Sequence, residues 1–185
     1  MQLDIVKYGH PTLRAKGGKV RRIDDQIRRL VADMLETMRA ASGVGLAAQQ
    51  VDRPLQLTVI DVAGVEERPS RMWIDGVETD PAGHMPLILI NPAIETSGAP
   101  ESGTEGCLSF PDISADITRP ARVSVRARDL DGQPLEFEAE GLLSRAVQHE
   151  VDHLNGVLFI DRMNSAVKAS LKSKLKRLRE QNNGN

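Results

Sequence analysis

The stretch His149-Glu150-Val151-Asp152-His153 is an H-E-x-x-H motif, which is typical of a metal-binding helix. Residues four apart on an α-helix lie one above the other, so both imidazoles face the same side. Two histidines at this spacing can hold one metal ion, and the glutamate after the first can reach a water molecule beside it. The alternative is a surface helix with two unrelated histidines. Because two of the four histidines of the chain lie in these five residues, the motif favours a metal site.

The third ligand distinguishes the classes of metalloenzyme that share this motif. Six residues after the second histidine, where metzincins carry another, this chain has Phe159. The downstream glutamate, Glu180, lies in a basic tail. Cys107, the only cysteine, lies in Glu105-Gly106-Cys107-Leu108-Ser109. A lone cysteine is often an inert buried side chain. A thiolate with two histidines, however, leaves one coordination position open for water, so we predict Cys107 as the third ligand.

A glycine-rich segment, Gly43-Val44-Gly45-Leu46-Ala47-Ala48-Gln49-Gln50, forms a third motif. Paired glycines allow close backbone approaches that side chains would block. A carboxamide such as that of Gln50 can donate a hydrogen bond to a carbonyl oxygen that gains negative charge. By itself the segment is most typical of a tightly packed turn, and it lacks the G-x-G-x-x-G spacing of a dinucleotide site.

Together the three motifs resemble those of the peptide deformylases, G-x-G-x-A-A-x-Q, E-G-C-x-S and Q-H-E-x-D-H-x-x-G. They occur here in the same order, beginning at Gly43, Glu105 and Gln148. The segment from Val6 to Arg14 is also similar to the N-terminus of that family, so the likeness covers residues 1–163. It implies a metal-dependent hydrolase that removes the formyl group from the N-terminal formylmethionine of nascent polypeptides and releases formate. It also implies Fe²⁺ as the working ion, with Zn²⁺, Ni²⁺ or Co²⁺ able to occupy the site.

These motifs assign roles to individual residues. Glu150 is expected to accept the proton of the attacking water and to return a proton to the departing amine. Gln50 and, by resemblance, the backbone N–H of Leu108 would stabilise the tetrahedral oxyanion. The expected metal ligands are Cys107, His149 and His153.

Other residues are expected to surround this centre. Glu105 and Gln148 are predicted to orient the site without contacting the ion. The resemblance implies an apolar pocket for the methionine side chain, with the long, charged Arg145 at its rim. The residues expected to line the pocket are Val44, Gly45, Leu142, Arg145 and Ala146.

Two other functions compete with this hypothesis. A zinc endopeptidase is disfavoured because the usual third-ligand patterns fail and Cys107 lies in E-G-C-x-S. An inactive, ribosome-associated binding module is disfavoured because such a module has no need of a general base such as Glu150. Formate release from formylmethionyl peptides, compared with cleavage of an internal peptide bond, separates the three.

Composition agrees with an enzyme but does not identify it. A chain of 185 residues suits one domain with a substantial core. A net charge of −2 argues against a DNA-binding protein. One cysteine excludes a disulfide framework, and the first residues start no signal peptide, so we expect a cytoplasmic protein. No apolar run has membrane-spanning length, so no membrane partner is expected.

Hydrophobic patterning predicts an α+β fold, because strands cluster before a helix and do not alternate with helices. A helix is predicted over 25–41 with Asp24 as its N-cap. Strands are predicted over 55–61, 87–90 (ended by Asn91-Pro92), 122–128 and 135–140, with a hairpin at Asp131-Gly132 between the last two. A second helix opens at Gly141, carries the metal motif and ends at Asn155-Gly156. The resemblance implies antiparallel sheets packed around this central helix.

Two segments stand apart from this pattern. Residues 62–86 are predicted to form a surface insertion, with a small hairpin around Asp75-Gly76, and a functionless loop is favoured over contact with substrate. Residues 164–185 form a basic C-terminal tail after the catalytic domain of residues 1–163. Seven basic and two acidic residues lie between 161 and 185, and the tail carries a helical apolar stripe of Val167, Leu171, Leu175 and Leu178. A helix docked on the domain is slightly favoured over transient contact with the ribosome.

Overall fold

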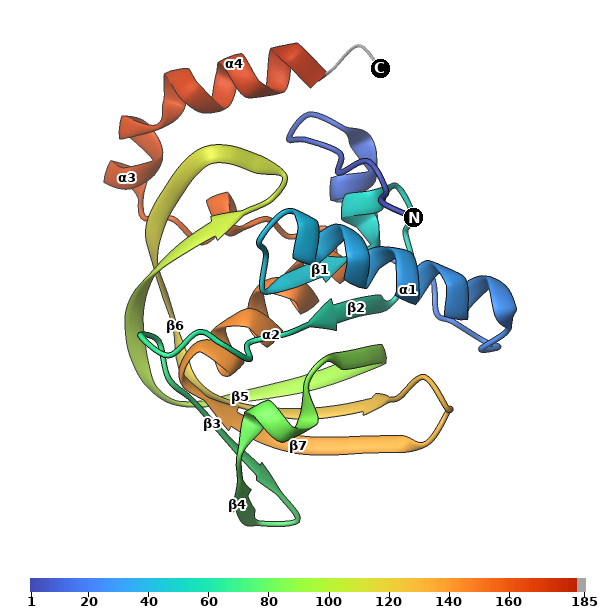
Figure 1. Ribbon diagram of the computed structural model, residues 1–185. Helices are drawn as coiled ribbons and strands as arrows, with labels where there is room; N and C mark the ends of the chain where they lie inside the picture. The colour runs from blue at the N-terminus through green and yellow to red at the C-terminus, as the bar shows by residue number, and fades with distance from the viewer. Residues whose placement is uncertain (183–185) are drawn as a thin grey trace.

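One curved antiparallel sheet frames the protein, and helix α2 packs against it (Figure 1). The computed structural model describes residues 1–182. Within that range the strands are β1 (Gly45–Ala47), β2 (Leu57–Ile60), β3 (Ser70–Ile74), β4 (Val77–Thr79), β5 (Leu87–Cys107), β6 (Phe110–Arg128) and β7 (Pro134–Glu140). The helices are α1 (Asp25–Ala40), α2 (Gly141–Leu154), α3 (Ser165–Ser170) and α4 (Lys172–Asn182), with 3-10 turns η1 (Pro11–Arg14), η2 (Ala48–Val51), η3 (Pro81–His84) and η4 (Phe159–Asp161). The sheet order is β1-β2-β5-β6-β7-β3-β4 with antiparallel pairing throughout, so the predicted α+β class is confirmed.

Helix α1 confirms the prediction over 25–41 to within one residue. The carboxylate of Asp24 accepts the backbone N–H groups of Gln26 and Ile27, each at 3.1 Å, and so satisfies donors that the first helical turn leaves free. Its apolar face is buried against β1 and β2 through Val31, Met34 and Met38. The helix then ends just before the glycine-rich segment, which continues into β1 and η2.

Strand β5 corrects one sequence prediction. Asn91-Pro92 does not end the strand, which continues to Cys107. Asn91 adopts a left-handed φ of 53°, and the register with β6 shifts between Ile90 and Ala93, which is the signature of a β-bulge. A bulge accommodates Pro92, because a residue there need not donate to the ladder. The bulge therefore bends a long strand whose far end carries Cys107 to the site.

The predicted hairpin between 122–128 and 135–140 is confirmed as β6 and β7. The side chain of Asp129 accepts the backbone N–H groups of Asp131 and Gln133, at 2.9 and 2.8 Å, and closes the turn. Val123, Val125 and Phe137 are buried on the face that packs toward α2. Strand β6 begins at Phe110, well before the predicted segment, so β5 and β6 together form one long curved ribbon.

The prediction for residues 62–86 is only partly right. The hairpin at Asp75-Gly76 exists as β3 and β4, and both turn residues have positive φ, 51° and 76°, as a two-residue type I′ turn requires. However, β3 also pairs with β7, and Met72 on β3 is completely buried. The segment is therefore not a surface insertion throughout, because its first strand belongs to the sheet.

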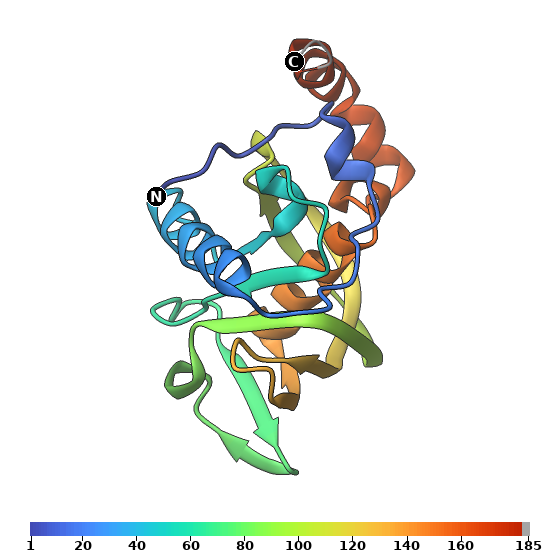
Figure 2. The same cartoon turned by 90° about the vertical axis from the view of Figure 1, so that its right-hand side faces the viewer.

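Helix α2 is held at both ends by other parts of the chain, and both views show it enclosed by them (Figures 1 and 2). At its start, Pro69 O and Ser70 Oγ accept the backbone N–H groups of Leu142 and Leu143, at 3.2 and 3.0 Å. At its end, Leu154 O accepts hydrogen bonds from Gly17 N, Gln49 Nε2 and Gln56 Nε2. The predicted boundaries at Gly141 and Asn155-Gly156 are confirmed.

Residues 164–182, the described part of the C-terminal tail, pack on the rest of the molecule. The predicted apolar stripe is divided between α3 and α4, which meet at Leu171. Leu175 is buried in a cluster with Leu13, Phe110 and Phe159, and the other stripe residues pack against that cluster. Both views show α4 close to η1 near the start of the chain (Figures 1 and 2). Among residues 1–182, no helix combines the length and apolar character needed to cross a bilayer.

Candidate active site

The predicted metal ligands come together from two elements. Helix α2 places His149 and His153 on successive turns, with ring centroids 5.0 Å apart. The end of β5 brings Cys107, whose Sγ lies 3.3 Å from Nε2 of His153. One ligand atom from each of the three residues lies within 4.8 Å of the others. A thiolate and two imidazoles in such a cluster fit a transition-metal ion.

The protonation of the two histidines reflects their surroundings. Burial alone lowers the pKa of His149, but hydrogen bonds with Cys107 and Glu105 outweigh it and hold that pKa well above its ordinary value of 6.5. Burial, aided by the charge of His149, lowers the pKa of His153 well below its ordinary value. His153 Nδ1 is buried and has no hydrogen-bond partner within residues 1–182. The surroundings of the site thus favour a positive charge on His149, next to Cys107, and disfavour one on His153. A bound metal cation can take the place of the proton on His149.

Glu150 lies beside the ligand cluster with a free carboxylate oxygen. Its side chain is buried, and Oε2 has no partner in the described part of the chain. Burial raises the pKa of Glu150 from 4.5 to about 7, although the charge of His149 acts in the opposite direction. A side chain at Gly45 would crowd this carboxylate, because a Cβ there would lie 2.8 Å from Cδ of Glu150. The second glycine of the glycine-rich motif therefore makes room for Glu150.

The Gln50 carboxamide is oriented by the turn that carries it. The backbone N–H of Ala47 donates to Oε1 of Gln50 at 2.9 Å, so the oxygen is fixed and Nε2 points the other way. Nε2 donates to Ser109 Oγ at 3.2 Å and lies 3.5 Å from Cys107 Sγ. Gln50 and Leu108 both line the pocket at the ligand cluster. A donor in this position can contact an oxygen that gains charge near the ion.

The N-terminal segment joins the two loops that carry these donors. Val6 N–H donates to the backbone oxygen of Gln50, and Tyr8 N–H donates to that of Ser109, both at 2.9 Å. Lys7 Nζ donates to Leu108 O at 2.8 Å. Burial lowers the pKa of Lys7, while Cys107 acts to raise it. Sequence analysis grouped this segment with the family only as a whole, and nothing in its pattern indicated these contacts.

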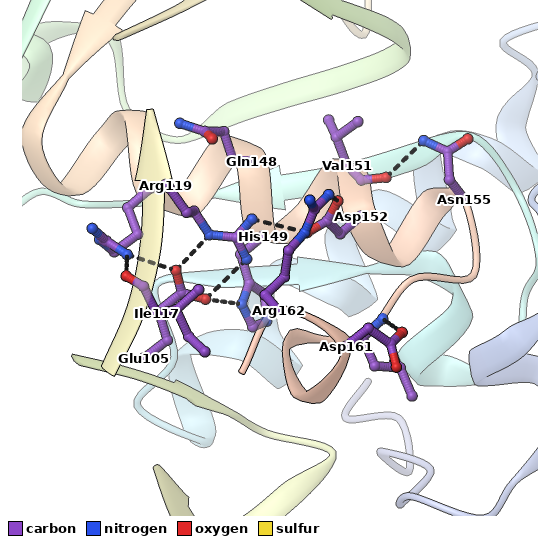
Figure 3. A network of polar contacts seen from close by, with 12 residues as sticks. Glu105, Ile117, Arg119, Gln148, His149, Val151, Asp152, Asn155, Asp161 and Arg162 are labelled. Carbon is purple, nitrogen blue, oxygen red and sulfur yellow. Dashed lines mark hydrogen bonds and ion pairs between the residues drawn. The ribbon is translucent and has the colours of Figure 1, made fainter. Parts of the chain in front are cut away.

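Glu105 contacts His149 directly, with 2.9 Å between Oε2 and Nδ1, and its predicted orienting role stays a prediction (Figure 3). The carboxylate of Glu105 accepts hydrogen bonds from Nε and Nη2 of Arg119, and another from Arg145 at 3.0 Å. Burial would raise the pKa of Glu105, but the hydrogen bonds from His149 and Arg119 lower it to about 2. The ionised Glu105 would therefore fix the ring so that Nε2 faces the ligand cluster.

A chain of charges, buried at Arg119 and Asp152 and exposed at Arg162, extends this contact across α2. Arg119 Nη1 donates to Asp152 at 2.9 Å, and Asp152 also accepts from Arg162 Nη2 at 2.7 Å (Figure 3). Asp152 lies inside the deformylase-like motif, so the sequence did contain a signal for it. Arg119 and Arg162 have no such signal, because both lie outside the three motifs.

Gln148 lies next to His149 in sequence but faces another element. Its Nε2 donates to Pro120 O at 2.9 Å and to Ser144 Oγ at 3.0 Å. The contact with Pro120 ties α2 to β6, whereas the contact with Ser144 lies within α2. Whether Gln148 orients the ligands through this tie stays a prediction.

A pocket of about 800 Å³ opens onto Cys107, His149 and Glu150. All five residues predicted for substrate binding line it, namely Val44, Gly45, Leu142, Arg145 and Ala146. The guanidinium of Arg145 is not free, because it donates to Glu105, Ile117 O and Glu101 O. Further walls that sequence analysis missed come from Lys7, Arg68 and residues 110–114.

Comparison with known proteins identifies the family of this chain. The family model for polypeptide deformylase matches residues 2–169. The chain belongs to this family. A peptide deformylase of Methylacidiphilum infernorum is 48% identical over 179 residues, which cover 97% of this chain and 94% of that protein. The structure of a Synechococcus elongatus peptide deformylase in complex with actinonin has 42% identity and a TM-score of 0.79, covering 93% of this chain and 87% of that one. A plant peptide deformylase has 36% identity and a TM-score of 0.83, covering 97% and 90%.

Membership of this family confirms the resemblance seen in the sequence. The protein is a metal-dependent hydrolase that removes the formyl group from N-formylmethionine peptides. The two competing hypotheses, a zinc endopeptidase and an inactive binding module, receive no support from these relatives.

Proposed function

We propose that Glu150 is the general base of this deformylase and that Cys107, His149 and His153 hold its metal. The observation that supports this best is the buried, unpartnered Oε2 of Glu150 beside three ligand atoms within 4.8 Å of one another. Burial raises the pKa of this carboxyl from 4.5 to about 7, which suits a group that must both accept and return a proton near neutral pH. Glu150 therefore takes a proton from the attacking water and delivers one to the departing amine.

The remaining residues act on the formyl group and the peptide. Gln50 Nε2 and the backbone N–H of Leu108 stabilise the negative charge that develops on the formyl oxygen. The orientation of Gln50 by Ala47, and the anchoring of Leu108 by Lys7, support this role because both donors are held before substrate binds. The methionine side chain enters the pocket beside Val44, Leu142 and Ala146.

We propose Fe²⁺ as the working ion. When bound, a divalent metal supplies Lewis-acid chemistry and lowers the pKa of a water molecule. A site with one thiolate and two imidazoles by itself favours Zn²⁺ over Fe²⁺ in raw affinity, and it also accepts Ni²⁺ or Co²⁺. The choice of iron therefore rests on the likeness to deformylases and is tested below by reconstitution.

We further propose that the enzyme acts in the cytoplasm on nascent chains and contacts the ribosome through α4. The buried Leu175 holds α4 on the domain, and its exposed face carries Lys172, Lys174, Lys176, Arg177 and Arg179. Replacing Lys172 and Lys174 with glutamine is expected to reduce the amount of enzyme that co-sediments with ribosomes. It should also make this binding less dependent on salt concentration. Glutamines at the exposed Arg21 and Arg22 serve as the matched control. Equal sedimentation of both variants would exclude the docking role.

One assay tests the catalytic proposal. Formate release from formylmethionyl-alanyl-serine and acetate release from its acetyl counterpart are measured, with the protein reconstituted anaerobically. Single Cys107→Ser, His149→Ala and His153→Ala variants are expected to lose bound metal and activity together. A variant that keeps both would remove that residue from the ligand set.

A further inference from the structure

Arg68 lies at the edge of the pocket, and its guanidinium has no ion-pair partner in the described chain. It lines the same pocket as Cys107 and Glu150, its side chain is exposed, and it forms no ion pair within residues 1–182. We propose that Arg68 selects substrates with an acidic side chain at the second or third residue, after the formylmethionine. This inference rests on the proposed substrate-binding role of the pocket and extends it to a residue from the 62–86 segment.

The backbone next to Arg68 is fixed to the catalytic helix. Pro69 O accepts the N–H of Leu142 at 3.2 Å, and Ser70 Oγ accepts the N–H of Leu143 at 3.0 Å. Ser70 also forms a β-bridge with Gly141. Because Leu142 lines the pocket one turn before Ala146 on the same helix, Arg68 is held at a set position relative to the methionine subsite. Because the adjoining backbone is held, the side chain of Arg68 loses freedom on binding a carboxylate but the loop does not have to be ordered as well.

The other two basic residues of the pocket, Lys7 and Arg145, already donate hydrogen bonds to the protein. Glu105 and Arg145 pair with each other, and Glu105 is further bound by Arg119. Lys7 is a second cation on the pocket wall, and its amine already donates to Leu108 O. Apart from Glu150 and Glu105, the acidic residue of the lining is Asp112, which is exposed and forms no ion pair in the described chain. The pocket lining has as many basic as acidic residues, three of each, so a substrate carboxylate would be attracted by the unpaired Arg68 and not by the net charge of the pocket.

The size of the pocket indicates which part of a substrate reaches Arg68. About 800 Å³ is within the range that accommodates a small-molecule ligand of drug size, which is more than one methionine side chain. The formyl group must lie at Cys107 and Glu150, and the first side chain lies beside Leu142 and Ala146. The residues that follow therefore extend toward the exposed rim, where Arg68 can meet a carboxylate.

Four peptides, all amidated at the C-terminus to remove the terminal carboxylate, test the proposal. They are formyl-Met-Asp-Ala, formyl-Met-Asn-Ala, formyl-Met-Ala-Asp and formyl-Met-Ala-Asn, and kcat/KM is measured by formate release at low ionic strength. Wild type is expected to prefer Asp over Asn by about two- to fivefold at one of the two positions, the range of an exposed ion pair. The preference should disappear near 1 M salt, where the screening length is about 3 Å.

Variants separate Arg68 from general charge effects. Arg68→Gln is expected to reduce the Asp/Asn ratio to about one, and Arg68→Glu to reverse the preference in favour of Asn. Arg29→Gln, on the exposed face of α1, is the matched control and should keep the wild-type ratio. An unchanged ratio in Arg68→Gln, or no preference in wild type while the Asn peptides are deformylated, overturns the role of Arg68 alone. Failure of all four peptides to release formate would instead overturn the function of the pocket.

Discussion

Replacing Glu150 with glutamine tests the chemistry most directly, because it keeps the shape of the side chain and removes its basicity. Glu150 is buried beside the ligand cluster, so the variant should still bind metal. An amide accepts no proton from water at neutral pH, and loss of a general acid–base typically costs about 10²–10⁴ in rate. At about 1.4 kcal/mol per factor of ten, this is roughly 3–5 kcal/mol of transition-state stabilisation.

The same substitution should change stability in a pH-dependent way in the metal-free protein. Burial raises the pKa of Glu150 from 4.5 to about 7, so in this range the folded state holds a proton that the unfolded state has lost. Wild-type stability therefore falls as pH rises from about 4.5 to about 7, by at most about 3 kcal/mol. Glutamine has no such loss, but its buried N–H groups lack an acceptor, at a cost of about 1–3 kcal/mol. We expect Glu150→Gln to melt below wild type at pH 5 and at or above it at pH 8.

Three measurements check this reasoning, namely kcat for formate release, metal content, and thermal melting of the metal-free protein at both pH values. Glu136→Gln, an exposed glutamate on β7, is the control and should match wild type in all three. A Glu150→Gln enzyme within threefold of the wild-type kcat would remove Glu150 from the mechanism. A melting difference that is the same at pH 5 and pH 8 would refute the raised pKa.

Other substitutions and the metal give further tests. Gly45→Ala should lower kcat at least tenfold with metal retained, because the new Cβ would lie 2.8 Å from Cδ of Glu150; a loss below twofold in steady-state kinetics would contradict this. Leu175→Ala should destabilise the protein by about 2–3 kcal/mol through loss of a buried side chain, and thermal melting indistinguishable from wild type would mean that α4 does not pack as described. Anaerobic reconstitution of metal-free protein should give higher turnover with Fe²⁺ than with Zn²⁺, and in air the iron form should lose activity faster than the Ni²⁺ form because Cys107 can be oxidised. Equal turnover with Zn²⁺ and Fe²⁺ would refute the proposal that Fe²⁺ is the working ion.

The sequence by itself determined the local parts of this protein. The helix that carries His149 and His153 follows from one pentapeptide, since the period of an α-helix fixes which side chains share a face. Asp24 as the N-cap of α1 and Asp75-Gly76 as a hairpin turn were predictable for the same reason, because each depends on a few neighbouring residues. Three short motifs in order were also enough to indicate the family.

The tertiary structure decided what depends on segments distant in sequence. Asn91-Pro92 was predicted to end a strand, but the side chain of Asn91 bonds to the backbone of Val20 and the strand continues through a bulge. Arg119 is buried because Glu105 and Asp152, which are 47 residues apart in the sequence, converge on its guanidinium.

The role proposed for Arg68 has the same character, since an exposed arginine in a loop carries no sign of function until the hydrogen bonds of Pro69 and Ser70 with α2 are known. Periodicity and turn preference act over a few residues and are visible in one segment. Ion pairs and pocket walls depend on which segments the fold brings together, so they appear only in the folded chain.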